Sequence, residues 1–148
     1  MRTLRNARRS SFRSLFAAVA IMSTLAACGD DGLIDPDPIA GVYTATTFRV
    51  TPSGQQEIDV LAQGGSLTIT IGANNTTTGT LNLPAVVTGD VALQESMAGT
   101  AERNGNGVTF EQTADTFVRD LNWTVVNNTI AVTNQSVGGA TFTIVLAR

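Results

Sequence analysis

The sequence contains no histidine and no lysine, and it has a single cysteine among its 148 residues. The lack of histidine excludes histidine-dependent catalytic triads and His-ligated zinc, and one cysteine cannot build a disulfide scaffold or a multi-cysteine metal site. The lack of lysine excludes Schiff-base chemistry and the phosphate-binding lysine of a P-loop. Most enzyme classes are thereby removed, and we expect no catalytic residues, no metal site and no cofactor.

The first 27 residues have the layout of a secretory signal peptide. Five arginines precede position 14, an apolar run follows from Leu15 to Ala27, and all twelve acidic residues come after position 29. As a helix the run would span about 20 Å at ~1.5 Å per residue, short of the ~30 Å hydrocarbon core of a bilayer, so a permanent membrane span is the weaker interpretation. The pair Arg8-Arg9 leaves a twin-arginine signal open, but Ser11 stands where that signal has an apolar residue, and the general secretory route is favoured.

The apolar run ends in a short motif, Leu25-Ala26-Ala27-Cys28. It resembles the lipobox of bacterial lipoproteins, in which a leucine and two small residues precede an invariant cysteine. The resemblance implies cleavage after Ala27, a diacylglyceryl group on the thiol of Cys28, and acylation of the new amino terminus. Two or three acyl chains hold a protein on a bilayer, whereas a single myristoyl chain binds only marginally. Cys28 is therefore predicted to be a lipidated membrane anchor rather than a buried structural cysteine.

The same resemblance implies a bacterial cell-envelope location, with the protein facing the periplasm or the cell surface. Gly29 rather than aspartate follows the cysteine, which by lipoprotein sorting rules favours the outer membrane over the inner one. Residues 29–38 combine two glycines, two prolines and four acidic residues without periodicity, so residues 28–38 are predicted to be the lipidated cysteine and an acidic tether. Fully extended, the tether reaches at most ~35 Å.

The chain that remains after cleavage is acidic. It carries four arginines against twelve acidic residues, a net side-chain charge of −8. Such a surface repels nucleic-acid phosphates and anionic lipid headgroups. We therefore expect no nucleic-acid partner and membrane contact only through the lipid on Cys28, and the sequence identifies no protein partner.

From residue 39 to the C-terminus, apolar side chains alternate with hydroxyl-bearing ones, as in Leu67 to Ile71 and Phe142 to Leu146. This alternation is typical of strands with one buried face, and Asn- and Gly-rich pairs separate the strands as turns. About eight short strands predict an all-β fold, an antiparallel up-and-down eight-stranded barrel over residues 39–148. A two-sheet β-sandwich stays open, because Pro84 to Glu95 could form the long connection that it needs. At most one helical turn is expected near Ile58 to Ala62 or Ala114 to Phe117.

The first strand opens with Ile39-Ala40-Gly41-Val42-Tyr43. It resembles the Gly-X-Trp start of lipocalins, with Tyr43 in the tryptophan position, and Met97-Ala98-Gly99-Thr100-Ala101 repeats its shape halfway along the chain. The resemblance implies a small lipocalin-like barrel on a bacterial lipoprotein. In lipocalins an arginine often packs on that aromatic ring, and Arg119 is the nearest equivalent, because it shares strand parity with Trp123 and would point inward if the strand is regular.

Three residues are candidate ligand contacts, namely Tyr43, Arg119 and Trp123. A buried arginine is costly unless it is paired. Arg119 would therefore stack on one of the two aromatic rings and either plug the barrel or meet a carboxylate-bearing ligand. The favoured alternative is that it sits at a strand end or on a bulge beside Asp115 or Asp120 and points to water. A single tryptophan such as Trp123 is more often a core filler than a ligand platform.

The preferred functional hypothesis is a lipid-anchored barrel that binds a small apolar molecule or lipid in its interior. The interior of eight strands is only just wide enough for side chains. The alternative is therefore a structural or protein-interaction module of the envelope with a filled barrel and no ligand. An enzyme ranks last, because paired carboxylates such as Glu57 and Asp59 have no aromatic platform for a sugar nearby and are best explained as a solvated edge.

Overall fold

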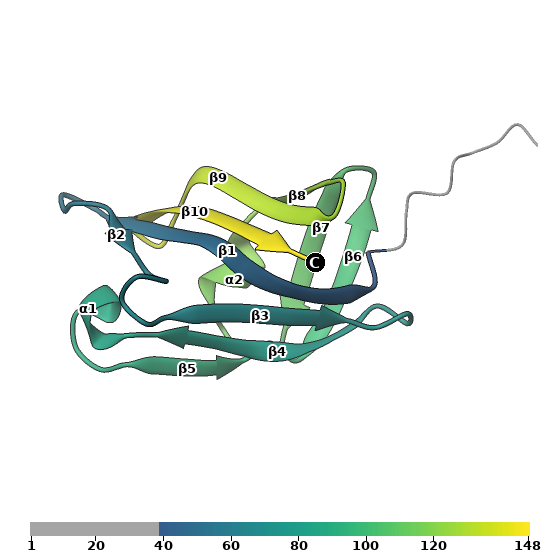
Figure 1. The fold of residues 1–148 in the computed structure, drawn as a ribbon, viewed down its shortest axis with the longest axis horizontal. Coiled ribbons are helices and arrows are strands. Elements are labelled where there is room, and N and C mark those ends of the chain that lie inside the picture. The colour runs from purple at the N-terminus through teal and green to yellow at the C-terminus, as the bar shows by residue number, and fades with distance from the viewer. Residues whose placement is uncertain (1–38) are drawn as a thin grey trace, which may run out of the picture. The chain divides into compact units, whose positions relative to one another are not determined.

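The computed structural model describes residues 39–148, so the predicted signal peptide, Cys28 and the tether lie outside the described residues. Ten strands and two one-turn helices make up the described part, and neither helix has the length and apolarity needed to span a bilayer. The elements (Figure 1) are β1 (Gly41–Pro52), β2 (Ile58–Asp59), β3 (Ser66–Ile71), β4 (Thr76–Leu83), α1 (Ala85–Thr88), β5 (Leu93–Ser96), β6 (Gly99–Asn104), β7 (Gly107–Gln112), α2 (Phe117–Asp120), β8 (Trp123–Val126), β9 (Thr129–Val137) and β10 (Ala140–Ala147).

Eight of the strands close into an antiparallel barrel. Each pairs with its neighbour along the chain in the order β1, β3, β4, β6, β7, β8, β9 and β10, and β10 returns to pair with β1 over eight residue pairs. The predicted up-and-down eight-stranded barrel is confirmed, and the two-sheet sandwich does not form. Closure leaves the barrel strands without the free edges at which sheets aggregate.

The stretch from Pro84 to Glu95 does not cross over the barrel. It forms α1 and then β5, which pairs with β4 in the same register as β6, from Thr80 opposite Ser96 to Thr76 opposite Thr100. β5 and β6 therefore act as one bent strand beside β4. At the bend lies Gly99, where φ is +159° and an added Cβ would collide with the carbonyl oxygen of Glu111. Glycine is required here for β6 and β7 to approach each other.

Alternation fills the barrel with apolar side chains. On β1 the buried residues are Tyr43 and Ala45, then Phe48 and Val50, so the inward parity changes along the strand. A register shift between Ala45 and Thr47 explains the change, because an extra residue in a strand sends the following side chains to opposite faces. The buried apolar residues of all eight strands form one core.

The two ends of the barrel are built differently, and we name them for reference. The tether end contains Ile39, the turns 72–75, 104–107 and 127–128, and the C-terminal Arg148. The helix end contains α1, α2 and the connections from β1 to β2 and from β9 to β10; α1 and the start of β1 lie at opposite ends of the barrel (Figure 1).

Both stretches in which a helical turn was expected lie in the described part of the chain. Near Ile58 to Ala62 the chain forms β2 and a turn rather than a helix. The turn is held by Asp59, whose Oδ1 accepts a hydrogen bond from the backbone N–H of Ala62 at 3.1 Å. The second helical turn does form, at Phe117–Asp120, where the predicted one ends. The structure adds α1, which the sequence did not indicate.

Candidate functional site

Tyr43 closes the tether end together with Arg148, not with Arg119. The ring of Tyr43 is 2% exposed, and the guanidinium carbon of Arg148 lies 6.0 Å from its centroid. The same guanidinium donates hydrogen bonds to the carbonyl of Ala40 at 3.0 Å and to Oδ1 of Asn128 at 2.8 Å. Arg148 thus joins the start of β1, the end of β10 and the β8–β9 turn.

The prediction that Arg119 points into the barrel is wrong. It assumed a regular strand, but residues 117–120 form α2, and strand parity does not apply to a helical turn. Arg119 lies partly exposed on α2 and forms an ion pair with Asp115. This is the alternative arrangement considered from the sequence. The buried side chain of the turn belongs instead to Val118, which is 0% exposed.

Trp123 is packed in the core beneath α2. Its ring is 1% exposed and meets Phe110 edge-on, with centroids 5.6 Å apart and an interplanar angle of 88°. Its Nε1–H donates a hydrogen bond to the carbonyl of Val118 at 2.9 Å. Trp123 therefore fills the core and also fixes α2 to β8. The three predicted contact residues do not form one site, because Tyr43 lies at the tether end and Arg119 on the outside of α2.

Aromatic rings gather at the helix end. Phe117 of α2 stacks on Phe142 of β10, with centroids 4.4 Å apart and planes at 14°, and lies 6.1 Å from the ring of Phe48 on β1. Phe48 and Phe142 are buried, whereas Phe117 is only partly buried. Phe117 of α2 is therefore the ring of this cluster that lies between the buried rings and the surface.

Backbone pairing is short between β7 and β8, the two strands that α2 connects. β7 and β8 share only two residue pairs, Gly107 with Thr124 and Val108 with Trp123. Beyond Val108, β7 continues to Gln112 without pairing to β8, and the segment containing α2 packs against it instead. A short helix with few backbone bonds to its neighbours takes the place of a strand at this point, and such segments open at low free-energy cost.

Two polar side chains are buried in this segment without partners. The buried residues of β7 are Val108, Phe110 and Gln112, so alternation points Gln112 inward. Gln112 is 4% exposed and Thr116 is 7% exposed, and neither the amide atoms of Gln112 nor the hydroxyl of Thr116 has a hydrogen-bond partner in the described chain. By contrast, the buried hydroxyl of Thr77 donates to the carbonyl of Met97 at 2.8 Å. Each unsatisfied buried group costs about 1–3 kcal/mol.

Sequence reasoning missed Gln112 and Thr116. The signal for Gln112 was available, because it continues the parity of Val108 and Phe110 and is polar. No comparable signal marked Thr116, whose burial depends on how α2 folds against β7. Of the sequence-predicted candidates, Trp123 bonds to this segment through Val118, and Arg119 lies on its α2 with its side chain paired to Asp115.

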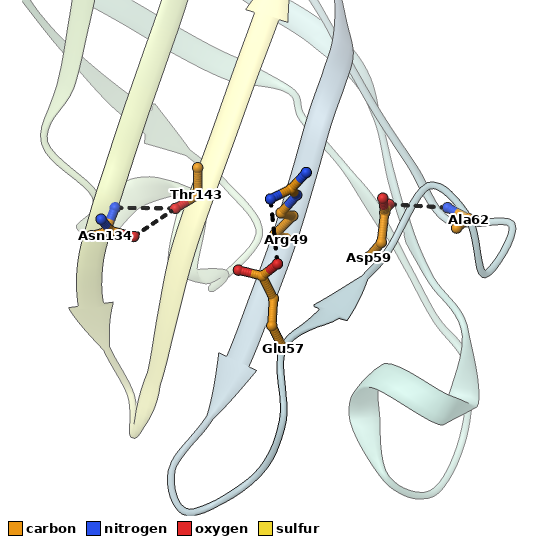
Figure 2. Close-up of polar contacts among 6 residues, drawn as sticks. All are labelled: Arg49, Glu57, Asp59, Ala62, Asn134 and Thr143. Carbon is orange, nitrogen blue, oxygen red and sulfur yellow. Dashed lines mark hydrogen bonds and ion pairs between the residues drawn. The ribbon is translucent and has the colours of Figure 1, made fainter.

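The carboxylates considered for catalysis are engaged in structural contacts on the outside of the barrel (Figure 2). Glu57 Oε1 lies 3.4 Å from Nη1 of Arg49, and Asp59 accepts the bond from Ala62 described above. Both fix the connection after β1. No cluster of acidic or cysteine side chains that could hold a metal is found in residues 39–148.

Figure 2 also shows a second local tie, between β9 and β10. The Oδ1 of Asn134 accepts a hydrogen bond from the hydroxyl of Thr143 at 3.1 Å, and the backbone N–H of Asn134 donates to the same hydroxyl at 3.2 Å. Asn134 has φ of +50° at the irregularity where the β9–β10 register shifts. The polar contacts on the outer wall therefore stabilise bulges and turns.

Two clefts on residues 39–148 are open to solvent. One of about 180 Å³ is lined by threonine, serine and small residues around the β9–β10 turn. The other, of about 220 Å³, lies beside the β6–β7 turn, and its lining includes Val108 and Trp123 as well as Asn122. Neither contains Phe117, Gln112 or Thr116.

No family model, no curated protein and no solved structure matches this chain closely enough to place it in a family. The lipobox and lipocalin resemblances therefore stay predictions. The candidate site is assigned from geometry alone, as the aromatic cluster under α2 with its two unsatisfied polar side chains.

Proposed function

We propose that this protein is a lipid-anchored protein of the bacterial cell envelope whose barrel binds a small, mostly apolar molecule at the helix end. The anchor is the lipid on Cys28, the body is presented on the tether, and it faces the periplasm or the cell surface, with the outer membrane favoured. The signal-peptide layout of the first 27 residues and the lipobox motif that ends it support the location.

The observation that carries the binding function is the seal at the helix end. A partly buried Phe117, on a one-turn helix, covers the buried rings of Phe48 and Phe142. Ligand sites in proteins are mostly apolar and aromatic, with a few polar groups that fix orientation. Because Tyr43, Phe110 and Trp123 occupy the rest of the interior, the ligand is small and lies under α2.

Binding is tested on the mature chain, residues 28–148 with Cys28→Ser, which keeps the barrel and removes the acyl chains that would compete for apolar probes. Trp123 is the only tryptophan and bonds to α2, so its fluorescence reports on this site. We expect saturable fluorescence changes with toluene or benzyl alcohol. Unchanged fluorescence, together with no retained molecule in native mass spectra of protein purified from its host, would exclude an interior ligand.

The lipid anchor has its own test. Intact-mass analysis of protein from the native host is expected to show the chain starting at Cys28 with two or three acyl chains. A free thiol at Cys28 would exclude the anchor and the envelope location that depends on it.

A second candidate function is a protein-interaction module with a filled barrel. It is favoured by the loop around α1, where Val86 is 57% and Val91 is 70% exposed, at the end of the barrel away from the tether. The double variant Val86→Ser/Val91→Ser would then abolish crosslinking to an envelope protein in cells. If crosslinking in cells recovers lipid and no protein, this candidate falls.

A further inference from the structure

Resting on the proposed function, we propose that Gln112 and Thr116 bind the uncharged polar group of the ligand. The ligand is then a small neutral molecule that joins an apolar body to a hydroxyl or carboxamide group. The observation that carries this inference is two unsatisfied hydrogen-bonding side chains on the short stretch from the end of β7 to α2, where Thr116 directly precedes the aromatic Phe117.

Gln112 is placed inside the barrel by the strand itself. Thr109 and Glu111 are exposed while Val108 and Phe110 are buried, so Gln112 can avoid the interior only if the strand loses its alternation. The residue paired with Gln112 is Gly99, which offers no side chain as a hydrogen-bond partner. The amide therefore presents both a donor and an acceptor toward the interior.

Thr116 stands directly before α2, where a threonine hydroxyl normally accepts a hydrogen bond from the first turn of the helix. Here the hydroxyl makes no such bond. Only three residues separate Thr116 from Gln112, and Phe117 follows it directly. The unsatisfied hydroxyl and the partly buried ring of Phe117 thus belong to adjacent residues of one short segment.

The absence of buried charged side chains in the described chain favours a neutral ligand. The buried residues of the described chain include no acid and no arginine. Arg119, on α2, is already paired with Asp115 on the surface. Glu95 pairs opposite the buried Leu81 and therefore faces the inner side of the barrel, where it would repel an anion. A carboxylate would have no cation here, and burying it unpaired is costly.

Hydroxyl and carboxamide groups match the two side chains. A carboxamide can accept from Nε2 of Gln112 and donate to its Oε1, and its second donor hydrogen or lone pair can reach a hydroxyl. A hydrocarbon satisfies neither residue. Compared with a hydrocarbon of the same size, a neutral alcohol or amide removes the cost of the unsatisfied groups when it binds.

The test measures calorimetric affinities of the Cys28→Ser mature chain for four probes of similar size, which are benzamide, benzyl alcohol, toluene and benzoate. We expect benzamide and benzyl alcohol to bind at least tenfold more tightly than toluene and than benzoate at pH 7. In Gln112→Leu the benzamide affinity falls at least tenfold while the toluene affinity is unchanged or higher. Thr116→Val, of nearly the same shape, lowers the benzyl alcohol affinity. Gln94→Leu, at an exposed position on β5, is the matched control and leaves all four affinities unchanged.

The outcomes separate this inference from the proposed function. If none of the four probes binds, the proposed function fails and the inference falls with it. If toluene binds as tightly as benzamide, or if Gln112→Leu leaves the preference for benzamide intact, the ligand site stands and the assignment of Gln112 is overturned. A crystal structure grown with benzamide that shows only ordered water on Gln112 and Thr116 also overturns it.

Discussion

The two ends of the barrel close in opposite ways. At the tether end, Arg148 makes two hydrogen bonds and lies against the ring of Tyr43, so strands β1 and β10 and a turn are held by one side chain. At the helix end, the closure is a one-turn helix, and on the stretch that leads into it Gln112 and Thr116 have no hydrogen-bond partners. The side chain of Arg148 thus has partners, whereas the buried polar side chains of Gln112 and Thr116 have none.

This difference indicates where the barrel can open. Segments with few backbone bonds and unsatisfied buried groups open at lower free energy than paired strands. β1 and β10 are joined by eight residue pairs, but β7 and β8 by only two. We therefore expect α2 to open while the rest of the barrel stays closed.

The largest effect should come from removing the residue that ties α2 to the core. Trp123→Ala deletes the Phe110 contact and the bond to Val118, and we expect a loss of about 3–5 kcal/mol in the free energy of unfolding, measured by urea titration. Trp123→Phe keeps most of the volume and loses the bond, so it should cost about 1 kcal/mol plus the missing contacts. A loss below 1 kcal/mol for the alanine variant would show that α2 is held elsewhere.

The next largest loss of stability should come from removing the side chain that closes the tether end. Arg148→Ala removes at least two hydrogen bonds and should cost about 1–2 kcal/mol or more, given roughly 1 kcal/mol for each. Amide hydrogen exchange should quicken at the start of β1 and in the β8–β9 turn but not in residues 113–122. Equal quickening at both ends would show that the ends are coupled rather than independent.

The two buried polar positions are expected to respond with opposite signs. Gln112→Leu replaces an unsatisfied amide with an apolar side chain, and stability should rise by about 1 kcal/mol. Thr77→Val removes a satisfied hydroxyl at a similarly buried position, and stability should fall by about 1 kcal/mol. Thermal unfolding of both variants checks this, and a destabilised Gln112→Leu would mean that the amide has a partner after all.

The smallest effect concerns the surface of α2. Arg119→Ala breaks an exposed ion pair with Asp115, and such pairs contribute about 0–1 kcal/mol. We expect a change in the free energy of unfolding below about 0.5 kcal/mol and no change in probe affinity. A larger loss of affinity would return Arg119 to the binding site.

The barrel itself could be predicted from local patterns. Alternation around Leu67 to Ile71 sets which face is buried, and turn residues such as Asn127, with φ of +55°, fit only a tight hairpin. These signals depend only on residues that are close in the sequence. Once the consecutive hairpins are predicted, only the pairing of β1 with β10 has to be inferred to close the barrel.

The site could not be predicted in the same way, because its contacts depend on distant residues. The arginine beside Tyr43 lies at the other end of the described chain, and only barrel closure brings Arg148 to it. The inward orientation inferred for Arg119 failed because the helical turn expected near Ala114 to Phe117 forms slightly later, at Phe117–Asp120, and therefore includes Arg119. The bulge after Ala45 likewise reverses parity without a mark in the residue pattern.

The claim that the helix end is where this barrel opens and binds is tested most directly by amide hydrogen exchange of the Cys28→Ser mature chain with and without benzamide. We predict that residues 113–122 exchange faster than β1 and β10 in the free protein and are slowed by benzamide, while the tether end is unchanged. Residues 113–122 that are as protected as β1 and β10, and unaffected by benzamide, would contradict it.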